Sequence, residues 1–112
     1  MTQSEMFFNQ RQERRVVLTL PVEISIGSQL TLQGQLKDIS SKSAFIKIKH
    51  SVYLQPNDEV GFAIHLSAEK AEESVRGVGR ISRIVAGEGF AVYFTKIHPD
   101  SAEPLKTLLA QP

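Results

Sequence analysis

A strict alternation of apolar and other residues over positions 16–26 is the feature that most limits how this chain can fold. One set of alternate positions is apolar throughout: Val16, Leu18, Leu20, Val22, Ile24 and Ile26. A period of two places such residues on one face of a β-strand, whereas a helix would spread them around its circumference. The pattern therefore predicts a half-buried strand over 16–26. Pro21, on the opposite face, lacks a backbone N–H and marks an edge or a bulge.

Further strand-like segments follow, separated by turn signals. The alternation resumes at 30–36 after Gly27 and Ser28, and later strands are expected at 44–49, 60–66, 75–85 and 90–94. Near the C-terminus, Asp100 and Glu103 have the spacing of a helix start, and the leucines that follow at helical intervals are Leu105, Leu108 and Leu109. This succession predicts a mostly β fold, a six-stranded antiparallel β-barrel with a C-terminal α-helix.

The length of 112 residues is that of a single domain. Residues 1–10 are polar apart from two adjacent phenylalanines, and we expect them to form a flexible N-terminal arm, with residues 11–112 as the domain. The start of the chain has no pattern of a secretory signal, and the longest apolar run is too short to span a bilayer. We therefore expect a cytoplasmic location without membrane insertion.

The composition excludes several kinds of chemistry. Because the chain has no cysteine, it has no disulfides, thiolate metal sites or cysteine nucleophiles. Thirteen basic and twelve acidic residues give a net charge of +1, too little for a broad phosphate-binding surface, so an anionic partner must be small and recognised locally. No Gly-x-Ser-x-Gly motif is present, and no metal-ligand spacing relates the three histidines, His50, His65 and His98. We expect no catalytic residues, no metal and no cofactor.

Three of the six arginines stand directly before the first predicted strand, at Arg11, Arg14 and Arg15. A guanidinium is flat, forked and always charged, so it can bind a phosphate or the O6/N7 edge of guanine through two hydrogen bonds. Arg11 and Arg15 lie at most about 14 Å apart in an extended chain and about 6 Å apart in a helix, and either distance suits a compact nucleotide with two phosphates. The alternative is a solvated basic arm.

A second polar group, Asp38-Ile-Ser40-Ser-Lys-Ser43, lies between the second and third predicted strands. One interpretation is a polar turn in which Asp38 or Ser40 caps the backbone. The other is one side of a guanine site, with Asp38 accepting hydrogen bonds from guanine N–H groups and Ser40 adding a hydroxyl. The residues alone leave both interpretations open.

Taken together, these groups resemble the PilZ domain, a family of bacterial receptors for cyclic di-GMP. The family combines R-x-x-x-R before the first strand with D-x-S-x-x-G after the second, on a six-stranded barrel with a C-terminal helix. The likeness covers about residues 10–110, and RGVGRISRIVAGEGFAVYFTKI is similar to the family's closing strand pair. It implies that Arg11 and Arg15 clasp the guanines and phosphates of cyclic di-GMP, while Asp38 and Ser40 hold a guanine against the barrel.

The resemblance also implies a function and points to one departure. Closing of the arginine arm on the ligand would alter a surface that a downstream protein, of unknown identity, recognises, and so regulate motility, surface attachment or exopolysaccharide output. Ser43 stands where the family pattern has glycine. If this position requires a positive φ, serine there costs about 1–2 kcal/mol and weakens ligand binding.

Two other classes of function remain open. A degenerate PilZ-like adaptor would bind a protein partner and no nucleotide, a hypothesis motivated by Ser43. A small barrel that binds single-stranded nucleic acid would need aromatic residues on a basic strand face, for which the one sign is Phe45 among Lys42, Lys47 and Lys49. We favour the cyclic di-GMP receptor, which is not an enzyme and does not bind nucleic acid.

Overall fold

The computed structural model describes residues 15–48, 54–66 and 74–110, so the predicted arm and Arg11 lie outside the described residues. The described strands are β1 (Val16–Val17), β2 (Pro21–Ile26), β3 (Leu30–Ile39), β4 (Ser43–Lys47), β5 (Glu59–His65), β6 (Ser74–Val85) and β7 (Gly89–Ile97). The described helical segments are a short 3-10 helix, η1 (Pro99–Ser101), and the helix α2 (Ala102–Leu109).

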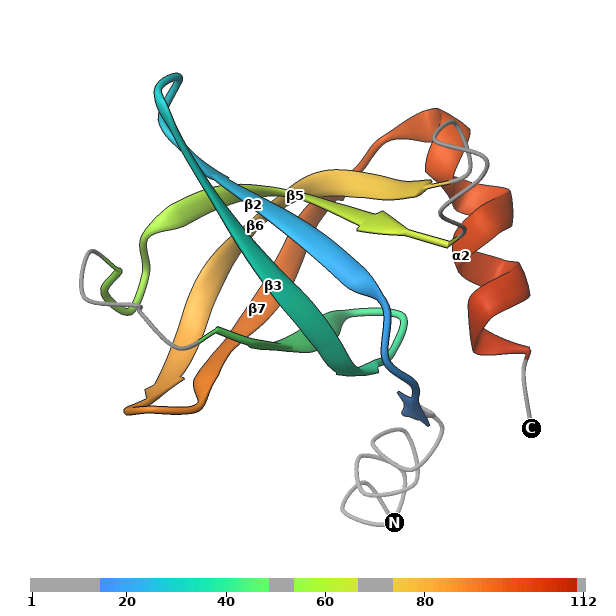
Figure 1. Ribbon diagram of the computed structural model, residues 1–112. Helices are drawn as coiled ribbons and strands as arrows, with labels where there is room; N and C mark the ends of the chain where they lie inside the picture. The colour runs from blue at the N-terminus through green and yellow to red at the C-terminus, as the bar shows by residue number, and fades with distance from the viewer. Residues whose placement is uncertain (1–14, 49–53, 67–73, 111–112) are drawn as a thin grey trace, which may run out of the picture.

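The strands form a closed antiparallel barrel (Figure 1). Around the barrel the neighbours are β3, β2, β5, β6, β7 and β4, and a pairing between β3 and β4 completes the circle. The short β1 pairs with the end of β3, and α2 lies at one end of the barrel beside β6. The predicted six-stranded antiparallel barrel with a C-terminal helix is confirmed.

The predicted first strand is interrupted. Val17 pairs with Asp38 and Pro21 pairs with Gln35, so residues 18–20 stand opposite only two residues of β3, which is the pattern of a bulge. Pro21 is the first residue of β2, a position where a missing N–H is tolerated, and β2 lies between β3 and β5 rather than at an edge. The apolar alternation continues through the bulge, because Val16 is buried on the side facing the core as in the rest of the strand.

The core fills the inside of the barrel with alternate residues of its strands. The largest fully buried apolar side chains are Phe90, Ile24, Leu36, Ile39, Ile46, Ile64, Ile81, Val22, Val60, Val75 and Val92. Phe62 and Phe94 stack with their ring centroids 4.9 Å apart. Gly89 lets β4 and β7 come close, because a Cβ atom placed there would lie 2.0 Å from the carbonyl oxygen of Ile46. This packing provides a firm base for the side chains on the outer face.

The C-terminal helix begins in a way that the sequence did not predict. Asp100 lies within η1, where its backbone N–H donates to Nδ1 of His98 at 3.1 Å. α2 follows Ser101, whose side chain makes no capping hydrogen bond with the helix. The predicted start at Asp100 and Glu103 is therefore wrong in detail, because η1 inserts one tight turn before the α-helix.

Ser101 instead fixes the helix to the barrel. Its buried hydroxyl accepts a hydrogen bond from the backbone N–H of Arg76 at 2.8 Å and donates one to the carbonyl oxygen of Ser74 at 3.3 Å. Both partners belong to the start of β6. From this anchor α2 packs Leu105 and Leu108 into the core, as their helical spacing predicts.

Candidate functional site

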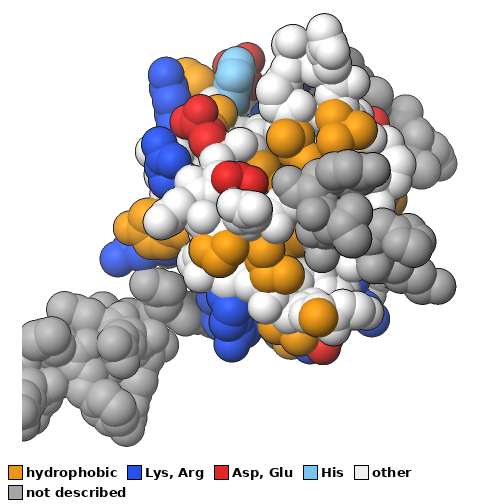
Figure 2. Space-filling model, turned by 90° about the vertical axis from the view of Figure 1, so that its left-hand side faces the viewer, with side chains coloured by type: hydrophobic (Ala, Val, Ile, Leu, Met, Phe, Trp, Pro, Cys, Tyr) orange, Lys and Arg blue, Asp and Glu red, His pale blue; other side chains and the backbone are white. Residues whose placement is uncertain are grey.

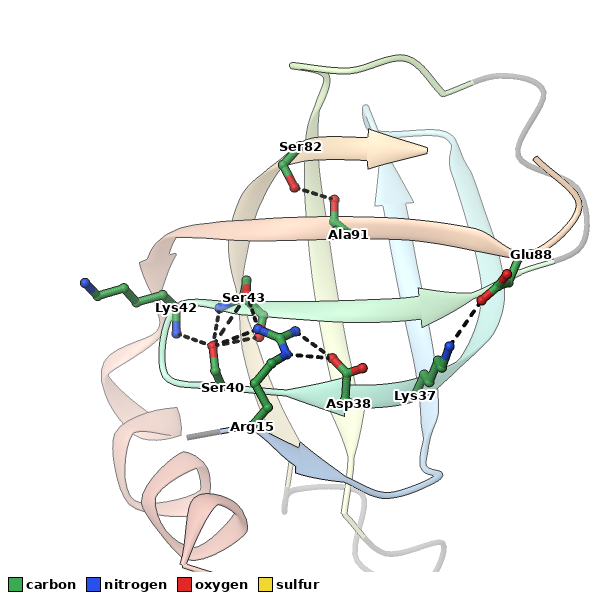
Figure 3. A network of polar contacts seen from close by, with 9 residues as sticks. All are labelled: Arg15, Lys37, Asp38, Ser40, Lys42, Ser43, Ser82, Glu88 and Ala91. Atoms are coloured by element: carbon green, nitrogen blue, oxygen red, sulfur yellow. Dashed lines mark hydrogen bonds and ion pairs between the residues drawn. The ribbon is translucent and has the colours of Figure 1, made fainter. Parts of the chain in front are cut away.

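Arg15 directs its guanidinium onto Asp38 (Figure 3). Arg15 immediately precedes β1, and β1 pairs with β3 so that Val17 faces Asp38 in the ladder. The guanidinium donates to the same carboxylate oxygen, Oδ1 of Asp38, from Nε at 3.1 Å and from the terminal nitrogen Nη2 at 2.5 Å. The side chains of Arg15 and Asp38 are 41% and 22% exposed, so this ion pair is open to solvent and to a ligand.

Two serines complete the cluster: Ser40, in the turn between β3 and β4, and Ser43, the first residue of β4. The hydroxyl of Ser43 accepts a hydrogen bond from Nη1 of Arg15 at 2.9 Å, and the Ser40 oxygen lies 3.4 Å from the same nitrogen. Four of the five residues predicted for the ligand site are thus brought together, although 23 to 28 positions separate Arg15 from the other three. The fifth, Arg11, lies outside the described residues.

Ser40 also holds the turn itself. Its fully buried oxygen accepts hydrogen bonds from the backbone N–H groups of Lys42 and Ser43, both at 3.2 Å, and its own N–H donates to the Ser43 carbonyl at 2.8 Å. The capping interpretation of this segment is therefore correct for Ser40. Asp38 caps nothing among the described contacts and presents its carboxylate to Arg15.

Backbone strain was expected at Ser43 if this position required a positive φ, and that condition is not met. Among the described residues other than glycine, only Asn57 has a positive φ, and Ser43 is the first residue of β4. Any L-residue adopts such an extended backbone without the left-handed penalty. What distinguishes serine from glycine here is its hydroxyl, which binds Arg15.

A shallow hollow of about 330 Å³ opens beside this cluster and extends across the outer face of the barrel. It is lined by Arg15, Asp38, Ser43, Phe45, Ser82, Arg83 and Ala91. Phe45 is only 6% exposed yet is not part of the core cluster, which places its ring in the outer face as an apolar floor. The ammonium group of Lys37 lies 5.3 Å from the centre of this ring.

Ser82 and Arg83 were not predicted as residues of the site. Both lie on β6, far from the two motifs in sequence, and only the strand pairing brings them beside Asp38. The signal available in the sequence was weak: an exposed arginine on a strand ordinarily belongs to a solvated face.

A larger hollow of about 730 Å³ lies elsewhere on the barrel. Figure 2 shows one face of the molecule, on which hydrophobic side chains gather among charged ones. The larger hollow is lined by Leu32, Gln33, Gly34, Gln35, Lys47, Ile48, Gly87 and Glu88. Glu88 is paired with Lys37, at 3.2 Å. Among the described residues that line the larger hollow, Lys47 is the only cation, whereas two arginines line the smaller hollow, which is therefore the better candidate.

The remaining polar groups do not suggest another site. Nε2 of His65 lies 3.8 Å from a carboxylate oxygen of Glu23, and His98 caps η1. His50 is outside the described residues. In the described part of the chain no three potential ligand residues are grouped so that they could hold a metal ion. No helix within the described ranges has the length and apolar character needed to cross a membrane.

Comparison with known proteins places this geometry in a family. The family model of the PilZ domain matches residues 9–111. Among solved structures, the Bacillus subtilis inhibitor of motility (MotI/DgrA) has a TM-score of 0.70 and 17% identity, covering 89% of this chain and 47% of that one. The PilZ domain of CeSA from a cellulose-synthesizing bacterium has a TM-score of 0.64 and 21% identity, covering 86% of this chain and 94% of that one. No curated protein matches the chain.

The two structural matches establish the fold, and the chain spans about half the length of the Bacillus protein, 47%. The family model extends over almost the whole sequence, from before Arg11 to the end of α2. It therefore includes both predicted motifs as well as the barrel. The chain belongs to the PilZ domain family, whose members are receptors and adaptors for cyclic di-GMP.

Proposed function

We propose that this protein is a receptor for cyclic di-GMP, which it binds on the outer face of the barrel with Arg11, Arg15, Asp38 and Ser40, at a site that includes Ser43 in the position of the motif glycine. The observation that carries the proposal is the convergence of Arg15, Asp38, Ser40 and Ser43 beside an open hollow. Forked cations and a carboxylate are the groups that recognise phosphates and the polar edges of guanine. In this proposal residues 1–10 form the arm and residues 11–112 the receptor domain.

Binding requires an exchange of partners at Asp38. Guanine presents neighbouring N–H donors, N1–H and the N2 amino group, and the guanidinium of Arg15 presents a similar pair to Asp38 in the free protein. Arg15 therefore occupies the position that a guanine would take. When the ligand binds, Asp38 accepts from the guanine, and Arg15 transfers to a phosphate or to the O6/N7 edge of a base, so that each charged group keeps a partner.

In this proposal Arg11 contacts the ligand from the N-terminal arm. It precedes Arg15 by four positions, so an arm that closes over the ligand brings a second guanidinium to the same nucleotide. This closure changes the surface that a downstream protein recognises and so regulates motility, surface attachment or exopolysaccharide output in the cytoplasm. Two similar structures point to such outputs by their names, an inhibitor of motility and a domain of CeSA from a cellulose-synthesizing bacterium.

Titration calorimetry with cyclic di-GMP tests the proposal directly. The expected dissociation constant is about micromolar or tighter, GTP should bind much more weakly, and Arg11→Ala should weaken binding about tenfold or more because it removes a charge-assisted contact. Amide exchange at residues 11–16 should slow when the ligand binds. Unchanged affinity in both Arg11→Ala and Arg15→Ala would refute the arginine clamp.

A PilZ adaptor that binds no nucleotide is the alternative, and one observation favours it. Ser43, which replaces the glycine of the motif, gives Arg15 an additional acceptor and so strengthens the closed cluster in the absence of a ligand. If neither the wild type nor a variant without this hydroxyl binds cyclic di-GMP, the adaptor replaces the receptor as the proposed function.

A further inference from the structure

One row of residues crosses four neighbouring strands on the outer face. Asp38 of β3 pairs with Phe45 of β4, Phe45 pairs with Ala91 of β7, and Ala91 pairs with Arg83 of β6. All four residues line the hollow of about 330 Å³. With about 4.8 Å between adjacent strands, Asp38 and Arg83 stand about 14 Å apart along the sheet. The hollow thus has a guanine-binding residue at one end and an arginine at the other.

The middle of the row is low and apolar. Ala91 has the smallest side chain that carries a Cβ atom, and Phe45 is only 6% exposed. The ammonium group of Lys37 lies 5.3 Å from the centre of the Phe45 ring, so a base or ribose that packs on this floor lies beside Lys37 or takes its place on the ring. A cyclic dinucleotide held by one guanine at Asp38 would therefore place its second half over Phe45 and Ala91, toward Arg83.

Arg83 is suited to receive that second half. Its side chain is exposed and has no ion pair or hydrogen bond to any other described residue. Asp38 is already paired with Arg15, so the described lining residues, with two arginines and one aspartate, carry one excess positive charge. By contrast, Arg80 on the same strand donates to the carbonyl oxygen of Asn57.

We infer that Arg83 is a further ligand-binding residue, which takes the phosphate or guanine of the second half of the dinucleotide with its guanidinium. This inference rests on the proposed function and adds a contact that lies outside both sequence motifs. Arg83 favours a cyclic dinucleotide over GMP, because a mononucleotide bound through its base at Asp38 has no second nucleoside to place over Phe45 and Ala91 toward Arg83.

The test compares the affinity of the wild type for cyclic di-GMP with the affinities of Arg83→Gln, Arg83→Lys and Arg76→Gln. Arg76 is a matched control, since it is an exposed arginine on the same strand, outside the hollow. Arg83→Gln should bind about tenfold more weakly or worse, and Arg76→Gln should bind like the wild type. Arg83→Lys should recover only part of the loss if the forked geometry matters as well as the charge. In spectra of the wild type, the Nε–H resonance of Arg83 should shift on addition of cyclic di-GMP.

The outcomes separate this inference from the function on which it rests. If the wild type binds cyclic di-GMP and Arg83→Gln binds equally well, Arg83 is not a ligand-binding residue, although the receptor function stands. If the wild type does not bind, the receptor function fails and the role of Arg83 fails with it. Unchanged melting temperatures of the variants would establish that a loss of affinity is not a loss of fold.

Discussion

Removing the hydroxyl of Ser43 should strengthen the binding of cyclic di-GMP. In the free protein this hydroxyl accepts a hydrogen bond from Arg15 at 2.9 Å and helps to hold the guanidinium on Asp38. Binding of a guanine at Asp38 requires Arg15 to leave. Ser43→Ala removes one of the contacts that must be broken, and it does so without changing the freedom of the backbone as glycine would.

The size of the effect follows from the exposure of the pair. A hydrogen bond to a charged group contributes about 1.5–3 kcal/mol when it is well shielded. The side chain of Arg15 is 41% exposed, so the contribution here is smaller, about 1 kcal/mol. If the whole of it opposes binding, Ser43→Ala should bind cyclic di-GMP about fivefold more tightly.

Titration calorimetry on three variants measures this effect and its cause. Ser25→Ala is the matched control, because Ser25 is an exposed serine of β2 that does not line the hollow. Ser43→Gly should match Ser43→Ala in affinity, since Ser43 has no positive φ to relieve, but should be less stable by about 0.4–1 kcal/mol in urea unfolding.

Two results would contradict the reasoning. Weaker binding by Ser43→Ala would mean that the hydroxyl contacts the ligand rather than restraining Arg15. Much tighter binding by Ser43→Gly than by Ser43→Ala would mean that the Cβ atom itself crowds the ligand or strains the turn.

Three further predictions concern the site and the barrel that supports it. Asp38→Asn should weaken cyclic di-GMP binding about tenfold or more in calorimetry. Because the ion pair of Asp38 is exposed, the same change should alter the free energy of unfolding by less than about 1 kcal/mol. Equal losses of binding energy and of unfolding free energy would indicate a structural role for Asp38. Gly89→Ala should lower the free energy of unfolding in urea by about 2 kcal/mol or more, since the new Cβ atom would overlap the carbonyl of Ile46. Gly61→Ala is the control and should cost far less, because its Cβ atom would lie 3.6 Å from its nearest neighbour. Ser101→Ala should lower the melting temperature and cost about 1–3 kcal/mol, because the backbone N–H of Arg76 loses its acceptor. A cost near zero would mean that water replaces the hydroxyl.

Much of the fold could be predicted because the inward residues of a strand recur at every second position. The same alternation could not reveal the bulge at residues 18–20, since Leu18 and Leu20 keep the apolar period while the pairing with β3 slips by one residue. The alternation of apolar residues shows which face of the strand each side chain lies on. It does not show which residue of the neighbouring strand each one pairs with, because that depends on how the two strands align.

The site was predictable to the extent that its residues form short motifs. The positions of Arg15, Asp38, Ser40 and Ser43 follow from the resemblance to PilZ domains, but their contacts in the free protein do not, because they depend on β1 pairing with β3. The possible strain at Ser43 was inferred from the glycine of relatives, and the strand conformation here removes its basis. The sequence could not place Arg83 in the site, because three successive strand pairings bring it into the same row as Asp38.

The smallness of β1 has an energetic consequence for signalling. β1 has two residue pairs with β3, whereas the pairings that form the barrel itself contain between four and eight. With each ladder hydrogen bond contributing about 1 kcal/mol and the burial of Val16 about 1.5–3 kcal/mol, detaching β1 costs less than the about 8 kcal/mol that a micromolar ligand releases. The barrel pairings are individually more expensive to open. If the protein binds a ligand as proposed, the segment that carries Arg15 is therefore the part of the described structure that moves at the lowest cost, while the barrel keeps its shape.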